Sequence, residues 1–238
     1  MYQRQSKYKE AAELYKKVLC FLTESNDKRW EGIRYKNLGT VLQSLGEYDK
    51  AAEYHQKALL ITKEIGEKKD ETSCYRNLGT VFQSLGEYVK AEEHLQKALL
   101  IAREIADKTN AASCYENLGT VFQSLGDYVK AEEYLQKALL IRKEIGDKEG
   151  EATDDENLGT VFQSLDKNVK AKEYHLKALL IRKEIRDKKG EASSYGNLGT
   201  VFQSLGEYVK AEEYHQKALV IRKEIGDKKG EASDLTET

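Results

Sequence analysis

The tetrapeptide Asn-Leu-Gly-Thr occurs five times in the sequence, and each copy lies 40 residues after the one before. The segments Gln-Ser-Leu and Lys-Ala-Leu recur at the same spacing. Self-similarity at a period of roughly 20–50 residues indicates a repeat protein, in which each copy is one supersecondary unit. Such a chain stacks its copies on one another rather than folding around a single central core.

The period sets the predicted domain organisation. We expect one array over residues 1–238, with five full repeats at 28–67, 68–107, 108–147, 148–187 and 188–227. Residues 6–27 match only the second half of a repeat, and residues 228–238 match only the start of one, as a truncated or capping helix. Because a terminal repeat has one uncovered face, either flanking sequence is missing or copies of the chain stack end to end.

Each repeat is predicted to contain two helices. In the first, Tyr35, Leu38, Leu42 and Leu45 recur at helical spacing, and Gly46 supplies the left-handed residue that ends a helix. With no proline and no alternating strand pattern in the chain, the predicted fold class is all-α. Stacked antiparallel hairpins of this kind form an α-solenoid, a right-handed superhelix.

The second helix of the repeat is predicted to pack on two sides. The triplet Leu59-Leu60-Ile61 widens its apolar face, as expected of a helix between its own partner and the next hairpin. Gly39 and Ala51 are small in every copy. We therefore expect them where two helix backbones approach closely, since a larger side chain there would overpack the core.

Composition excludes several classes of function. The formal net charge of −2 provides no field that would attract nucleic acid or anionic lipid. No apolar run approaches the roughly 18 residues of a membrane span, and the first residues lack the apolar stretch of a secretory signal. We therefore expect a cytoplasmic protein with neither a nucleic-acid nor a membrane partner.

No motif for catalysis, a cofactor or a metal ion is present. Glycines occur singly, without the spacing of a phosphate-binding loop. His55, His175 and His215 share a repeat position that Leu95 and Leu135 fill in other copies, so we expect them to pack between helices. The three cysteines form neither a disulfide framework nor a zinc pattern: Cys20, Cys74 and Cys114.

The recurring residues resemble the tetratricopeptide repeat. That signature matches, in order and spacing, the stretch Tyr35-x-x-Leu38-Gly39-x-x-Leu42-x-x-x-Gly46-x-Tyr48-x-x-Ala51-x-x-x-His55-x-x-Ala58. The usual proline after the second helix is replaced by Lys or Arg, which lets the helix continue beyond the standard length. The longer variant resembles the arrays of Pins/LGN-type G-protein regulators, rapsyn and long metazoan arrays. This resemblance implies a non-enzymatic scaffold that binds an extended peptide of a partner protein in a concave groove formed by its first helices.

Opposite its apolar stripe, each first helix carries a polar, uncharged face. Amide side chains both donate and accept, so an asparagine ladder can hold the backbone of an extended peptide whatever its side chains. The resemblance likewise places this asparagine on the peptide-binding face. Alternatively, the face is merely solvated, or its asparagines tie adjacent first helices together. The predicted peptide-binding residues are Asn37, Thr40, Gln43, Asn77, Thr80, Gln83, Asn117, Thr120, Gln123, Asn157, Thr160, Gln163, Asn197, Thr200 and Gln203.

The residue before each ladder asparagine varies between copies. It is Lys36, Arg76, Glu116, Glu156 and Gly196 in turn. We expect a ligand to place an acidic group against the first two and basic groups against the two glutamates. The alternative, that these are solvated charges, stays open.

The fourth repeat departs from the pattern. Asp154 and Asp155 replace small and aromatic residues, and Asp166 replaces the turn glycine. A lone carboxylate in an apolar site costs several kcal/mol unless it reaches water or a partner, so this hairpin is predicted to be the softest and a hinge. The acidic cluster at 147–156 lacks the EF-hand pattern, and we expect it to pair with the basic run at 182–189 rather than with a cation.

Overall fold

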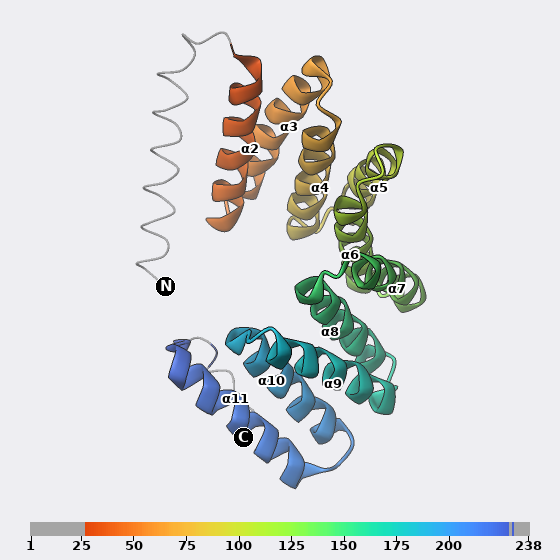
Figure 1. Ribbon diagram of the computed structural model, residues 1–238, viewed down its shortest axis with the longest axis vertical. Helices are drawn as coiled ribbons and strands as arrows, with labels where there is room; N and C mark the ends of the chain where they lie inside the picture. Colours follow the sequence, from red (N-terminus) through yellow and green to blue (C-terminus); the bar gives the residue numbers. More distant parts are fainter. Residues whose placement is uncertain (1–26, 229, 231–238) are drawn as a thin grey trace. The chain divides into compact units, whose positions relative to one another are not determined.

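The computed structural model describes residues 27–228 and Gly230, and it is helical throughout this part of the chain, without strands. The helices are α2 (Lys28–Ser44), α3 (Tyr48–Ile65), α4 (Lys68–Ser84), α5 (Tyr88–Glu104), α6 (Lys108–Ser124), α7 (Tyr128–Ile145), α8 (Lys148–Ser164), α9 (Asn168–Glu184), α10 (Lys188–Ser204) and α11 (Tyr208–Ile225). Figure 1 follows them along the chain. The all-α prediction is confirmed. The partial repeat predicted at 6–27 lies almost wholly outside the described residues, as does most of 228–238.

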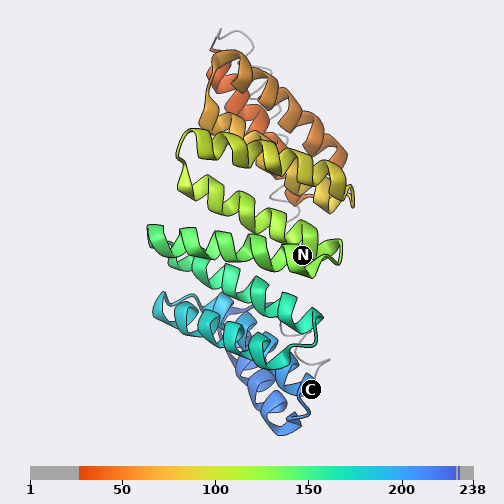
Figure 2. The same cartoon turned by 90° about the vertical axis from the view of Figure 1, so that its right-hand side faces the viewer.

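Two compact units make up the chain, residues 1–125 and residues 126–238. In the first unit each of the helices α2 to α6 packs on the next, and the first helices α2, α4 and α6 also touch one another. In the second unit α7 to α11 pack in the same sequential way. Figure 2 shows these layers of neighbouring helices. Each unit is therefore a stack of helical hairpins, which is the predicted α-solenoid arrangement.

Helix ends fall at residues that the sequence singles out. Gly46 closes α2 in the left-handed region, with φ of 79°. Asp166 takes the same place after α8 with φ of 56°, a conformation that costs a residue with a Cβ atom about 1 kcal/mol. Aspartates cap several helix starts by accepting from a backbone N–H, as Asp107 does from Asn110 at 3.0 Å.

Close approach of the two helices in a hairpin requires the recurring glycine. A Cβ atom on Gly39 would lie 2.7 Å from the His55 ring, and one on Gly79 would lie 2.5 Å from Leu95. Ala51 is fully buried, and the carbonyl oxygen of its equivalent Ala91 would lie 3.3 Å from a Cβ atom on Gly79. The predicted role of the small residues is confirmed.

The predicted burial of Leu60 is wrong. Leu59 and Thr62 are buried, whereas Leu60 is 70% exposed. Successive helix residues point about 100° apart, so the face that buries Leu59 and Thr62 turns Leu60 to solvent. The equivalent residues of the other copies are exposed as well: Leu100, Leu140, Leu180 and Val220.

A buried arginine joins successive hairpins in the second unit. The Arg142 guanidinium lies 2.9 Å from carboxylate oxygens of both Asp147 and Asp154. It packs so closely on α8 that a Cβ atom on Gly150 would lie 1.6 Å from its Nη1 atom. Arg182 packs on Gly190 in the same way. The arginine thus requires a glycine eight residues later in the chain.

Candidate functional site

One asparagine of the predicted ladder lies on each first helix. Asn37, Asn77 and Asn117 belong to the first unit, and Asn157 and Asn197 to the second. All five are partly buried, and none of their amides forms a hydrogen bond within residues 27–228 and 230. None of these amide atoms is enclosed without a partner either, so each can still donate to and accept from a ligand.

The glutamines of the first unit tie first helices together. Gln43 donates through Nε2 to the Thr80 hydroxyl at 3.2 Å, and Gln83 donates to Thr120 at the same distance. The sequence leaves open that the asparagines link adjacent first helices. In the first unit these links are formed by the glutamines instead. Gln43 and Gln83 therefore position the first helices of this unit, and the amides of its asparagines stay available to bind a ligand.

Three of the ladder threonines and Gln163 form hydrogen bonds within their own hairpins. The hydroxyls of Thr40, Thr160 and Thr200 donate to carbonyls one turn earlier in the helix. Gln163 accepts from Nε2 of His175 at 3.1 Å. Gln123 is partly buried and Gln203 is exposed.

Two of the four predicted specificity residues are held by neighbouring helices. Lys36 Nζ lies 2.6 Å from a carboxylate oxygen of Asp70 on α4. Glu156 lies 3.1 Å from Arg182 and accepts from the Ser194 hydroxyl at 2.7 Å. Sequence reasoning missed these contacts, although the opposite charge 34 residues after Lys36 was a signal that could have found the first.

Arg76 is placed differently from Lys36. Asn110 stands where Asp70 stands in the preceding copy, and its amide donates to Asp107 at 2.9 Å. Arg76 is partly buried and has no ion pair or hydrogen bond from its side chain within the described part of the chain. Glu116, at the next equivalent position, is partly buried too.

Four buried titratable residues stay in their neutral forms at pH 7: His55, His175, Cys74 and Cys114. His55 and His175 are fully buried between helices, as predicted, and burial lowers the pKa of each to about 4. Burial raises the pKa of Cys74 to about 11 and that of Cys114 to about 12. At neutral pH both thiols stay protonated, so neither has the thiolate that cysteine chemistry needs.

Two aspartates of the fourth repeat, Asp154 and Asp155, are buried in the hairpin stack. Asp154 is fully buried and pairs with Arg142, so the expectation that the 182–189 run neutralises the cluster holds for Glu156 but is wrong for Asp154. Asp155 is 1% exposed, and its Oδ1 atom has no hydrogen-bond partner among the described residues. Burial raises the Asp155 pKa to about 6.

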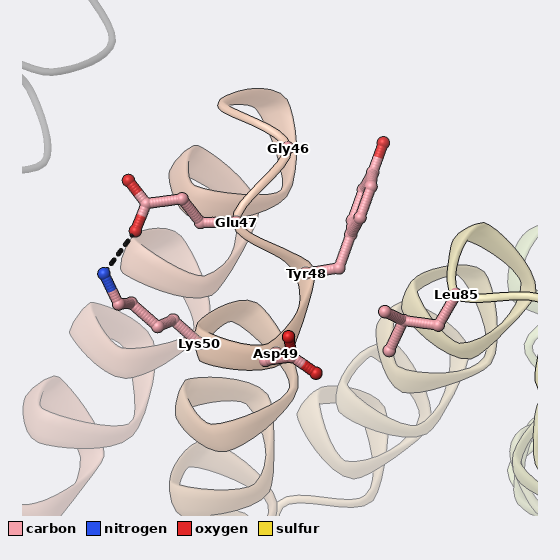
Figure 3. Close-up of a pocket in the computed structure, with 6 residues that line it drawn as sticks. All are labelled: Gly46, Glu47, Tyr48, Asp49, Lys50 and Leu85. Atoms are coloured by element: carbon pink, nitrogen blue, oxygen red, sulfur yellow. Dashed lines mark hydrogen bonds and ion pairs between the residues drawn. The ribbon is translucent and has the colours of Figure 1, made fainter.

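A shallow depression lies between the α2–α3 turn and the end of α4. Its volume is about 380 Å³, and it is lined by Gly46, Glu47, Tyr48, Asp49, Lys50 and Leu85. Figure 3 shows Lys50 turned toward Glu47, with which it pairs at 2.7 Å. It contains no residue of the ladder, so it is not part of the predicted site.

These features define a class of protein. In each unit the stacked hairpins carry unbonded amides on their first helices, and within residues 27–228 and 230 no group of side chains is arranged to hold a metal ion. No helix in that range is long and apolar enough to cross a membrane. The class is a helical-repeat scaffold.

Comparison with known proteins identifies the family. The tetratricopeptide repeat model matches residues 1–64, 30–93, 70–144 and 151–224. The chain therefore belongs to the tetratricopeptide repeat family. No curated protein matches the sequence. The finer resemblance to Pins/LGN-type regulators and rapsyn stays a prediction.

Solved structures share the fold. BtubC (BKLC) from P. vanneervenii is 22% identical, with 94% of this chain and 92% of that chain covered and a TM-score of 0.76. The apo form of RapI is 18% identical, with 94% of both chains covered and a TM-score of 0.72. A Rap protein complexed with Competence and Sporulation Factor is 19% identical, with 98% of this chain and 69% of that chain covered and a TM-score of 0.74. At these identities the likeness establishes the fold alone.

Proposed function

We propose that this chain is a non-enzymatic scaffold that holds an extended segment of a partner protein along its first helices. The observation that carries the proposal is the set of asparagine amides that are partly exposed and unbonded within the described residues. Extended peptide backbone exposes alternating N–H and C=O groups, and each amide can meet one of each.

The neighbouring bonds support this use of the asparagines. Since Gln43 and Gln83 already link α2 to α4 and α4 to α6, the first helices are held in place before a ligand arrives. A ligand then loses less free energy to ordering the protein, which favours binding. The Rap protein bound to Competence and Sporulation Factor supports the use of such a fold to hold a partner.

In the first unit we assign ligand specificity to Arg76. Its guanidinium is partly buried without an ion pair among the described residues, whereas Lys36 is neutralised by Asp70. A carboxylate of the ligand would meet Arg76 in a charge-assisted hydrogen bond, which is stronger than a neutral one. Glu116 and Glu156 stay as proposed contacts for basic groups of the ligand.

A peptide-display screen on the intact chain tests the proposal, followed by calorimetry on the selected peptides. The double variant Asn77→Ala/Asn117→Ala should bind them at least about tenfold more weakly, because each lost hydrogen bond contributes about 1 kcal/mol. The matched control is Gln96→Ala, which removes an amide that bonds only within α5, to Glu92 at 2.8 Å. Equal affinity of the double variant and the wild type would contradict the role of the ladder.

Stacking of copies end to end is a second proposal. Trp30 on α2 is 55% exposed, and Ile225 on α11, the last helix described, is 41% exposed. The equivalents of Ile225 in the other repeats are partly buried: Ile65, Ile105, Ile145 and Ile185. Apolar surface on the outer hairpins of a repeat array favours association. Light scattering over a range of concentrations tests it, and a constant monomer mass would exclude it.

A further inference from the structure

The second helix of the fourth repeat differs in charge from the other second helices. Lys167 stands before α9 where the other repeats have an acid, namely Glu47, Glu87, Asp127 and Glu207. Lys172 stands where three of them have Glu92, Glu132 and Glu212. Two positions that are mostly acidic in the other repeats are thus basic here, one just before α9 and one within it.

The exchange at Lys167 removes an ion pair that neutralises a lysine in other repeats. Before α3 and α11, the acid pairs with a lysine three residues later, Glu47 with Lys50 and Glu207 with Lys210. In α9 that lysine is Lys170, and its counterpart is now Lys167. Five lysines of this segment have no ion pair within residues 27–228 and 230: Lys167, Lys170, Lys172, Lys177 and Lys183.

Aromatic rings support the unpaired lysines instead. Lys170 lies 5.2 Å from the centre of the Phe162 ring, Lys177 lies 4.4 Å from that of Tyr174, and Lys183 lies 5.0 Å from that of Tyr195. A ring face attracts an ammonium group but adds no opposite net charge. The field of Lys172 also contributes to lowering the pKa of Glu207, behind the hydrogen bond from Lys210. The lysines are thus placed without an ion pair within the described residues.

An apolar row runs along the same helix. Val169 is 58% exposed and Leu180 is 67% exposed. Leu176 stands where the other repeats have glutamine, and it packs partly buried against the Phe202 cluster. The spacing of seven and then four residues places these three side chains on one side of α9.

We propose that α9 is a docking surface for an acidic amphipathic segment of a partner protein. Its carboxylates would pair with the unneutralised lysines, and its apolar residues would cover Val169 and Leu180. A nucleic acid would use the lysines but leave the apolar row exposed. This surface lies on a second helix, so the proposal does not rest on the asparagine ladder.

The test uses the whole chain and a fluorescent peptide of Glu-Glu-Leu repeats, with binding followed by anisotropy. The variant Lys167→Glu/Lys172→Glu introduces residues that other repeats carry at these places, so the helix should fold normally, which circular dichroism checks. We expect about tenfold weaker binding, because two attractions become repulsions. We also expect wild-type binding to weaken with added salt and on exchange of the peptide leucines for serine.

The matched control is Lys210→Glu/Lys217→Glu in α11, which changes the net charge equally but alters lysines that are already paired with Glu207 and Glu213. Its binding should stay within about twofold of the wild type. Equal losses in both variants, or no loss in the α9 variant, would overturn the proposal. Tighter binding to a DNA duplex or to phosphatidylserine vesicles than to the peptide would overturn it as well.

Discussion

Replacing His175 with leucine should change how the stability of the second unit depends on pH. Other repeats carry Leu95 and Leu135 at this position, both fully buried, so the site accepts leucine beside the small residue of the first helix. The His175 ring is fully buried against Gly159, and its Nδ1 atom has no hydrogen-bond partner among the described residues. The variant removes this unsatisfied atom and also loses the Nε2–Gln163 hydrogen bond, and both contributions are independent of pH while the folded ring stays neutral.

The magnitude follows from the pKa of the ring. Burial lowers the His175 pKa from 6.5 to about 4. The unfolded chain therefore takes up a proton below pH 6.5 while the folded chain does not, and stability falls as pH drops from 6.5 toward 4. A shift of this size corresponds to a loss of about 3 kcal/mol by pH 4, since each pKa unit is worth about 1.4 kcal/mol.

Urea unfolding followed by circular dichroism, at pH values from 7.5 to 4.5 (roughly the window in which histidine titrates), measures the effect. The stability difference between His175→Leu and the wild type should grow in favour of the variant as pH falls. Taking the difference removes the contribution of carboxylates that titrate in both proteins. His55→Leu should behave likewise in the first unit, because burial lowers that pKa to about 4 too. A difference that stays constant over this range would refute the reasoning.

Three further predictions concern contacts between helices. The folded-state pKa of Asp155 is raised from 3.8 to about 6, so stability should fall by about 3 kcal/mol as pH rises from about 4 through 6, since each pKa unit is worth about 1.4 kcal/mol. Asp155→Tyr, the residue of the other copies, should remove this loss, about half of which falls between pH 5 and pH 8, as measured by urea unfolding at those two pH values. Gly150→Ala should destabilise by about 1–3 kcal/mol through overpacking against Arg142. The cost should be smaller, in the same assay, in an Arg142→Thr/Asp154→Cys background, which carries the equivalents Thr62 and Cys74 and leaves no buried carboxylate without its arginine. A double-mutant cycle on Lys36 and Asp70 should give a coupling near 1 kcal/mol, since both side chains are mostly screened from water. A coupling of zero would mean that this pair does not hold α2 to α4.

The softness predicted for the fourth repeat stays a prediction. Asp166 adopts a left-handed conformation and Asp155 is buried without a partner for Oδ1 among the described residues, and both weaken the hairpin. The Arg142–Asp154 pair and the Glu156–Arg182 pair act in the opposite direction by joining it to its neighbours. Faster amide exchange in α8 and α9 than in α10 and α11 would support the hinge.

The repeat period and the helical spacing of apolar residues were sufficient to predict the helices, the left-handed turn at Gly46 and the burial of His55. These features are local: 40-residue self-similarity identifies the unit, and a turn or an apolar stripe depends on residues close in the chain. The same helical spacing predicts a core position for Asp155, and the residue is buried. Sequence reasoning could also name the ladder asparagines, because their spacing puts them on one face of a helix.

Contacts between polar side chains on different helices were decided only by the tertiary structure. The sequence predicts that Lys36 and Glu156 face a ligand. In the stacked hairpins Lys36 pairs with Asp70, and Glu156 pairs with Arg182. The sequence predicts that Leu60 is buried, but the orientation of α3 against its neighbours exposes it to solvent. Periodicity states which side of a helix is apolar, whereas the pairing of polar groups depends on how far and at what angle the next helix lies. The distance and angle between helices come from tertiary packing. In the described residues this packing leaves the ladder asparagines without side-chain hydrogen bonds and the α9 lysines without ion pairs.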